Sequence, residues 1–352
     1  MRYLVAFLLL GLVACQQKST NDEVAVPAST TIEVSHAKHF RFVKTENETV
    51  LEILNPDTKK VMCQLVPFKE NKSVIALSGT FIGMMNQIGL ANQIVGVSET
   101  KYVYNPEVLK GYKSGKVLEC GYDSQMKIEL MMAKRPAAIF HSGYNKEFAH
   151  QKQFENVGIQ VLPIYDWREE SPLGKAEWIK VYGFLFGMEG QAKEYFDNVV
   201  SSYAEIKKVA QDLKPSELLM SGNIIGGEWC APAGESFIAQ IMKDANITYS
   251  DANSEGTGSV MSTIEQMYSK NRHAKFWVNP GSKTLKQLSQ DNPKAVLFDA
   301  FHNKHVFCYM NNDTFYWEES AVSPHLLLQD YIYMAHPELG KQDELHFYKR
   351  LQ

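Results

Sequence analysis

The chain opens its folded part with an alternating pattern of apolar and polar residues. Residues 32–68 contain two such runs, around "HFRFVKTENETVLEILNP" and "KVMCQLVPF", and Asn55-Pro56-Asp57 lies between them. Alternation places successive side chains on opposite faces of a strand, and Asn-Pro-Asp is typical of a tight turn. The pattern predicts a small β appendage over residues 32–68.

Short apolar runs and helical patterns then alternate along the chain. Runs such as "SVIALS", "IVGVS", "AAIFHSG" and "IQVLPIYDW" are separated by amphipathic stretches, and the alternation restarts after Pro215 with "LLMSGN", "AKFWVN" and "HVFCYM". Strands that alternate with helices form parallel sheets covered by helices. We therefore expect an α/β fold with two parallel-sheet lobes, an N-terminal lobe over residues 69–187 and a C-terminal lobe over residues 214–352.

One long helical pattern separates the two predicted lobes. Its apolar residues recur at spacings of four and three and form one stripe: Ala192, Phe196, Val199, Tyr203, Ile206, Ala210 and Leu213. Such a stripe also occurs in coiled coils, but Phe and Tyr in the seam make a poor zipper. We predict a single long helix over residues 188–213 that bridges the lobes.

The motif Ile-Glu-x-Met-x-x-Lys occurs twice, as "IELMMAK" and "IEQMYSK", each time before a strand pattern. Glu129 and Glu265 are the glutamates of the two copies. A carboxylate at a helix start is favoured by the helix dipole, which is sufficient to account for either copy alone. Recurrence at matching places in two lobes points to a shared role, and we expect both carboxylates to point to solvent at the start of their helices.

Composition and charge narrow the class of protein. The 352 residues include 45% hydrophobic and 22% charged residues and have a formal net charge of −4, so they offer no basic surface for nucleic acid. The N-terminus "MRYLVAFLLLGLVAC" resembles a bacterial lipobox, which predicts a signal peptide at 1–14, lipidation of Cys15 and a flexible tether at 15–31. Four cysteines remain, Cys63, Cys120, Cys230 and Cys308, as disulfides in one of three pairings or as free thiols.

Aromatic and polar side chains gather in the predicted loops after strands, where ligands of α/β folds bind. The candidate ligand-binding residues are Tyr102, Tyr104, Tyr122, His141, Tyr144, Trp167, Glu228, Trp229, Tyr316 and Trp317. Core packing accounts for any one of the aromatics, but the group favours a flat, conjugated ligand. The sequence has no G-x-S-x-G, H-E-x-x-H or P-loop motif, and few arginines besides Arg168 lie near the expected cleft.

The order of lipobox, α/β lobe, long helix and second α/β lobe resembles the substrate-binding proteins of ABC importers for iron complexes, haem and cobalamin. The likeness covers residues 72–340 and includes "SVIALSGTFIGMMNQIGLANQIVGVSE", "YVYNPEVLKG", "IELMMAKRPAAIF" and "WCAPAGESFIAQIMKDANITY". Ala137 departs from it, because the family usually has Asp there.

The resemblance implies a non-catalytic, monomeric receptor in the cell envelope, anchored by its lipid and facing the periplasm or the cell surface. Its ligand would be a ferric siderophore, haem or cobalamin, with no resident cofactor or metal. Its partners would be a permease and its ATPase, with Glu129 and Glu265 docking on permease arginines. That role implies that both glutamates are exposed on one side of the molecule, one per lobe, without a cationic partner. A receptor for bare zinc or manganese ions remains an alternative, and an enzyme on a similar bilobal scaffold is a weaker one.

Overall fold

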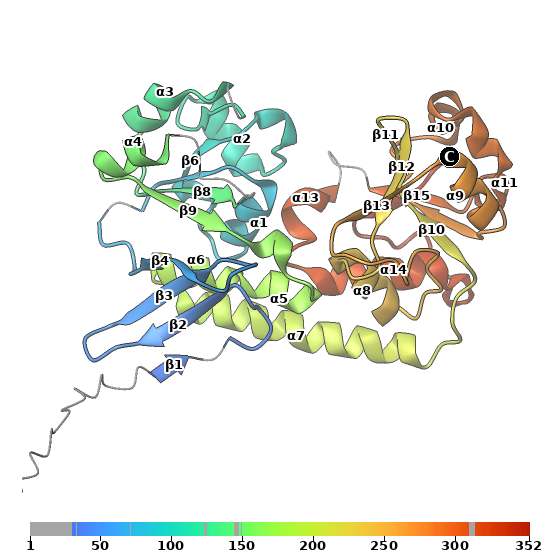
Figure 1. Ribbon diagram of the computed structural model, residues 1–352, viewed down its shortest axis with the longest axis horizontal. Coiled ribbons are helices and arrows are strands. Elements are labelled where there is room, and N and C mark those ends of the chain that lie inside the picture. Colours follow the sequence, from blue (N-terminus) through green and yellow to red (C-terminus); the bar gives the residue numbers. More distant parts are fainter. Residues whose placement is uncertain are drawn as a thin grey trace, which may run out of the picture.

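The computed structural model describes residues 30–32, 34–70, 72–122, 125–143, 148, 150–309 and 314–352. Two α/β lobes lie side by side above one long helix, and a small sheet packs beside the N-terminal lobe (Figure 1). The predicted fold class is confirmed. The signal peptide, Cys15 and most of the tether lie outside the described residues.

The small sheet is antiparallel, in the order β1-β2-β3-β4, with strands β1 (Thr30–Ile32), β2 (Phe40–Lys44), β3 (Thr49–Leu54) and β4 (Val61–Leu65). Phe40 and Phe42 pair with Ile53 and Leu51, so all four lie on the buried face. The Phe40 ring packs edge-on against Trp178, with ring centroids 4.9 Å apart. This contact fixes the sheet to the helices of the N-terminal lobe.

Two buried carboxylates hold the chain that leads into β2. Glu177 accepts backbone N–H bonds from Ser35, His36 and Ala37, and Glu169 accepts bonds from the two residues that follow, 38 and 39. Burial raises the pKa of Glu169 to about 7, although these donors favour its charged form. The small sheet is therefore held by polar contacts as well as by its apolar face.

The N-terminal lobe has a five-stranded parallel sheet in the order β7-β6-β5-β8-β9. Its strands are nearly continuous apolar runs because helices cover both faces. The strands are β5 (Val74–Ala76), β6 (Ile94–Val97), β7 (Leu118–Glu119), β8 (Ala138–Ser142) and β9 (Gln160–Ile164). The helices are α1 (Gly79–Gln87), α2 (Pro106–Lys113), α3 (Ile128–Ala133), α4 (Gln151–Asn156), α5 (Pro172–Glu177) and α6 (Ile179–Phe186), with 3-10 turns η1 (Ala91–Gln93), η2 (Thr100–Tyr102) and η4 (Asp166–Arg168).

Helix α7 (Glu189–Gln211) runs beneath both lobes (Figure 1). Ala192, Phe196 and Val199 pack into the core of the N-terminal lobe. Further along the same stripe, Tyr203 and Ala210 pack into the core of the C-terminal lobe. The stripe is therefore buried within one chain, and the coiled-coil alternative does not apply.

The C-terminal lobe has a sheet in the order β10-β14-β15-β16, parallel except for its last strand, and a separate three-stranded antiparallel sheet. The first contains β10 (Leu219–Ser221), β14 (Phe276–Val278), β15 (Val306–Tyr309) and β16 (Tyr348–Arg350); the second contains β11 (Asn223–Ile225), β12 (Glu228–Pro232) and β13 (Ser259–Ser262). Helices are α8 (Phe237–Asp244), α9 (Ile264–Asn271), α10 (Leu285–Asp291), α11 (Asp299–His302), α13 (Tyr316–Glu319) and α14 (Pro324–Ala335), with 3-10 turns η5 (Pro293–Leu297) and η6 (Pro337–Leu339). The sequence pattern does not predict the antiparallel sheet or β16.

Two further features bear on the sequence predictions. Cys63, Cys120, Cys230 and Cys308 are all free thiols, which selects one of the two alternatives. Among the described residues, no helix combines the length and the apolar character that crossing a bilayer requires.

Candidate functional site

A cavity of about 650 Å³ lies between the two lobes. Its N-terminal wall is built at the carboxyl ends of strands, because Leu77 follows β5 and Ser98 follows β6. Its opposite wall comes from the end of β15 and from α13, which lies between the lobes in Figure 1. The described lining residues are Leu77, Ser78, Gly79, Thr80, Ser98, Glu99, Tyr102, Tyr122, Tyr309 and Trp317.

Exposed aromatic rings face this cavity from both lobes. Tyr102 and Tyr122 of the N-terminal lobe are 53% and 56% exposed, and Trp317 of the C-terminal lobe is 45% exposed. Exposed rings of this size are costly in water and become favourable when a ligand covers them. The cavity can therefore stack a flat, conjugated ligand between its walls.

The C-terminal wall is supported from behind by further aromatic rings. Tyr309 stacks on the buried Tyr316, with ring centroids 4.2 Å apart and an interplanar angle of 8°. Trp317 meets Tyr309 edge-on at 5.4 Å. Burial raises the pKa of Tyr309, so its hydroxyl stays neutral and can serve a ligand as a hydrogen-bond donor.

The N-terminal wall adds polar groups to the rings. The hydroxyls of Ser78 and Thr80 lie 3.1 Å apart at the start of α1. Glu99 carries the only formal charge among the described lining residues, and it pairs with Lys101 at 3.0 Å. The lining is thus mainly apolar with a few polar groups and little charge, which does not favour a strongly anionic ligand.

The loop that carries Tyr102 is held in place by two carboxylates. Glu119 accepts bonds from the Thr100 backbone N–H and hydroxyl, and these bonds lower the pKa of Glu119. Glu318 of α13 accepts the backbone N–H of Tyr104 at 2.7 Å. The sequence predicts Tyr104 as a ligand-binding residue, but Tyr104 contributes this backbone contact and does not line the cavity.

Three of the ten predicted ligand-binding residues therefore line the cavity: Tyr102, Tyr122 and Trp317. Tyr316 lies directly behind the wall, in the stack with Tyr309. Sequence reasoning missed Tyr309, although its place at the carboxyl end of an apolar strand pattern was an available signal. Tyr144 lies outside the described residues.

One prediction for the C-terminal lobe was wrong, and a second residue lies outside the cavity. Trp229 is fully buried, packs on Trp277 at 5.4 Å and donates its indole N–H to the backbone oxygen of Ser221. Glu228 is exposed at the start of β12 and does not line the cavity. The predicted loop is instead a strand of a hairpin, and its alternate residues point into the core.

His141 and Trp167 also lie away from the inter-lobe cavity. His141 lines a separate hollow of about 470 Å³ between the N-terminal lobe and the small sheet, with its ring 4.8 Å from Phe148. Burial lowers the pKa of His141 to about 4. Trp167 lies beside Arg168, which pairs with Asp57 of the small sheet at 2.6 Å. Arg168, expected near the cleft, is thus paired with the small sheet instead.

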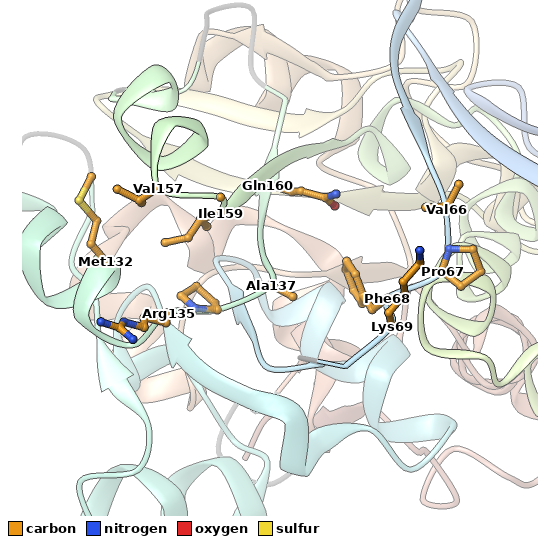
Figure 2. A pocket seen from close by; sticks show the side chains of 12 residues that line it. Val66, Pro67, Phe68, Lys69, Met132, Arg135, Ala137, Val157, Ile159 and Gln160 are labelled. Carbon is orange, nitrogen blue, oxygen red and sulfur yellow. The ribbon is translucent and has the colours of Figure 1, made fainter.

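The largest of the hollows described lies at the other end of the N-terminal sheet. Its volume is about 740 Å³, and Figure 2 shows its side chains spread around the amino ends of β8 and β9 and the segment that leads into the lobe. Its lining is Val66, Pro67, Phe68, Lys69, Met132, Arg135, Pro136, Ala137, Val157, Gly158, Ile159 and Gln160. Ligands of α/β folds bind at the carboxyl ends of strands, so size alone does not make this hollow the site.

The two glutamates of the repeated motif are exposed on different lobes. Glu129 lies on α3 and Glu265 on α9, and Figure 1 places both helices on the side of the molecule away from α7. Glu129 forms no ion pair within the described part of the chain. Glu265 is paired with Lys294 at 2.6 Å, and this bond lowers the pKa of Glu265. The expectation that neither glutamate has a cationic partner is therefore wrong for Glu265.

Metal-binding side chains do not converge in the part of the chain that the structure describes. No group of three His, Cys, Asp or Glu side chains there is placed to hold an ion. His302 ends α11 and His305 directly precedes β15, and the His305 ring stacks on Phe276.

Comparisons with known proteins place this geometry in context. An uncharacterized lipoprotein of Methanocaldococcus jannaschii is 26% identical over 284 residues, which cover 78% of this chain and 67% of the relative. Two solved structures share the fold, each with a TM-score of 0.59. A possible iron-binding periplasmic solute-binding protein of Staphylococcus epidermidis is 16% identical and covers 76% of this chain and 100% of its own. A periplasmic haem-binding protein of Vibrio cholerae is 14% identical and covers 75% and 99%.

A family model described as "Periplasmic binding protein" matches residues 74–312, which include the sheet of the N-terminal lobe, the bridging helix and the C-terminal lobe as far as β15. The match spans most of the chain and agrees with the order of elements in the structure. The chain belongs to the periplasmic binding protein family.

Proposed function

We propose that this protein is the substrate-binding lipoprotein of an ABC importer and captures an iron complex, as a siderophore or as haem, or cobalamin. The observation that carries the proposal is the cavity between the lobes, lined by exposed aromatic rings from both. A receptor binds its ligand without reacting with it. Aromatic walls can bind a flat ligand by stacking on its faces, which also removes those faces from water.

The lining favours a chelate over a free ion. Tyr102, Tyr122 and Trp317 offer ring faces, and Ser78 and Thr80 offer hydroxyls for the edge of a ligand. A cavity of about 650 Å³ lies within the usual range for small-molecule sites, roughly 300–1,000 Å³. Haem and the corrin ring of cobalamin present a conjugated face for stacking and polar substituents at the edge, and a neutral ferric chelate likewise offers apolar surface, so each suits rings combined with hydroxyls.

Delivery would use the side of the molecule that carries α3 and α9. Glu129 and Glu265 present one carboxylate per lobe on this side, which suits a permease with two-fold symmetry and two sets of arginines. Lipidation of Cys15 would keep the receptor at the membrane, facing the periplasm or the cell surface, and the Methanocaldococcus relative is itself named a lipoprotein.

The test is a titration of the purified protein with haemin, cyanocobalamin, a ferric catecholate and a ferric hydroxamate, followed by tryptophan fluorescence. We expect one chelate class to bind in a 1:1 complex with a Kd of about 1 μM or tighter. Trp317→Ala should weaken that binding, whereas Tyr112→Ala should not, because Tyr112 is exposed on α2 outside the cavity. Binding of zinc or manganese alone, with no response to any chelate, would support the bare-ion alternative instead.

A further inference from the structure

The segment that carries α13 belongs to both lobes. Tyr316 packs in the core of the C-terminal lobe. Five residues later, Ala321 and Val322 are buried in the core of the N-terminal lobe. The lobes are therefore joined a second time, on the cavity side of α7, by a turn whose own Trp317 lines the cavity.

The backbone of α13 lies directly against α1. A Cβ atom added to Gly83 would be 1.6 Å from the backbone oxygen of Glu318, and one added to Gly79 would be 3.3 Å from that of Trp317. Gly79 and Gly83 are four residues apart and so share one face of α1. The two glycines allow the backbone of α13 to approach α1 closely. Any larger side chain at position 83 would prevent this approach.

The side chain of Glu318 continues this contact into the N-terminal lobe. It is 2% exposed, and its Oε1 atom accepts the backbone N–H groups of Tyr104 at 2.7 Å and of Asn105 at 3.1 Å. These residues immediately precede α2 and end the loop that carries Tyr102. A buried N–H group that loses its acceptor is costly, so the two bonds hold the loop firmly.

We propose that Glu318 is a positioning residue that sets the width of the inter-lobe cavity, by fixing the Tyr102 loop of one lobe to the Trp317 turn of the other. The aromatic walls then stand at a fixed separation before the ligand arrives. A site that is already formed loses less conformational entropy on binding. The consequence for ligand affinity rests on the proposed function, whereas the fixing of the loop does not.

Amide hydrogen exchange, read by mass spectrometry on peptides covering residues 99–105, tests the fixing without any ligand. Glu318→Ala should make exchange there about tenfold faster, because the N–H groups of Tyr104 and Asn105 lose their acceptor. Glu318→Gln should stay near wild type, since an amide oxygen accepts the same bonds. Glu319→Ala is the matched control, because Glu319 faces His346 of the same lobe.

Glu318→Asp provides a second variant if the alanine protein does not fold. Its carboxylate is one methylene shorter, so it should break the contact and accelerate exchange at 99–105 while the amides of α7 keep their protection. Unchanged exchange at 99–105 in the Asp or Ala variant would overturn the proposal. So would equal acceleration in Glu319→Ala.

A second experiment measures ligand affinity. It uses whichever of haemin, cyanocobalamin or the two ferric siderophores binds the wild type. Glu318→Ala should weaken that chelate about tenfold, and Glu318→Gln should restore binding. A purely structural role would lower thermal stability without this loss, so Trp229→Phe serves as a destabilised control with an intact cavity. If no chelate binds the wild type, the proposed function fails, yet the exchange result still decides whether Glu318 fixes the loop.

Discussion

Tyr309 and Tyr316 stack almost in parallel, with ring centroids 4.2 Å apart and planes 8° from each other. Tyr316 is buried, whereas Tyr309 lines the inter-lobe cavity at the end of β15. Trp317 then leans on Tyr309 from the side, at 5.4 Å. The buried ring thus supports a wall of two rings, and the orientation of that wall is fixed by the core behind it.

Replacing Tyr309 by alanine should weaken ligand binding, because it removes one ring and the support of Trp317. We expect a loss of about 1–2 kcal/mol, or roughly five- to thirtyfold in Kd, and a smaller loss for Tyr309→Phe. Tryptophan fluorescence titration measures both. Tyr112→Ala, an exposed tyrosine outside the cavity, should bind like wild type. Equal affinities for Tyr309→Ala and Tyr112→Ala would show that the wall does not touch ligand.

Trp229→Phe should destabilise the fold without changing ligand affinity. The indole N–H donates to Ser221 at 2.9 Å inside the core, and phenylalanine would leave that acceptor without its donor. We expect the free energy of unfolding to fall by about 1–3 kcal/mol. Chemical denaturation measures the loss. A large fall in ligand affinity at unchanged stability would instead indicate that Trp229 contributes to ligand binding.

Some elements of the fold could be predicted from the sequence, whereas the strand that carries Trp229 could not. Hydrophobic periodicity identified the parallel sheets and α7, because a long apolar stripe at spacings of three and four residues requires a helix to bring its members onto one face. It did not identify the hairpin around Trp229, although Gly226 and Gly227 gave a turn signal. Both glycines have positive φ, 60° and 90°, as a tight hairpin requires.

Other parts of the site depend on contacts between distant segments. Lys294 reaches Glu265 from a position 29 residues away, and Arg168 reaches Asp57 across 111 residues. Nothing in local periodicity encodes such pairs. Strand alternation identifies the small sheet as an appendage, but the surfaces it covers, including the hollow beside His141, follow only from the tertiary arrangement.

His141 should make the fold sensitive to acid. Its pKa is lowered from 6.5 to about 4 by burial, so between these values the unfolded chain binds more protons than the folded one. Stability is then present above pH 6.5 and is lost as the pH falls toward 4. His141→Gln should reduce this loss by about 1–3 kcal/mol. Denaturation at several pH values measures it, and a variant with the wild-type pH profile would contradict the assignment. His302→Gln, at an exposed position, is the control.

Cys15→Ala should leave a folded protein that is released from membranes. The anchor would be a lipid on Cys15, since no other apolar run approaches the length of a span. Cell fractionation with antibody detection measures the release, and Cys63→Ala is the matched cysteine control. Retention of the Cys15 variant in the membrane after a salt wash would argue for another mode of attachment.

The repeated glutamates give the most direct test of delivery. Glu129→Ala combined with Glu265→Ala should reduce ligand uptake by cells at least about tenfold, because each carboxylate lost removes a charge-assisted contact at the permease. Ligand affinity and thermal stability should stay near wild type, since both side chains are exposed. Glu189→Ala combined with Glu205→Ala removes the same charge from exposed positions on α7, away from the α3 and α9 side, and should leave uptake intact.

The pairing of Glu265 with Lys294 predicts that the two glutamates differ. Glu129 is available at once, whereas Glu265 must exchange Lys294 for a permease cation. Glu129→Ala should therefore reduce uptake more than Glu265→Ala, and Lys294→Ala should raise uptake or leave it unchanged. Dose–response curves of uptake against receptor concentration separate weaker docking from slower transport. If Lys294→Ala impairs uptake as severely as Glu265→Ala, the ion pair itself is the docking element, and Glu265 does not act alone.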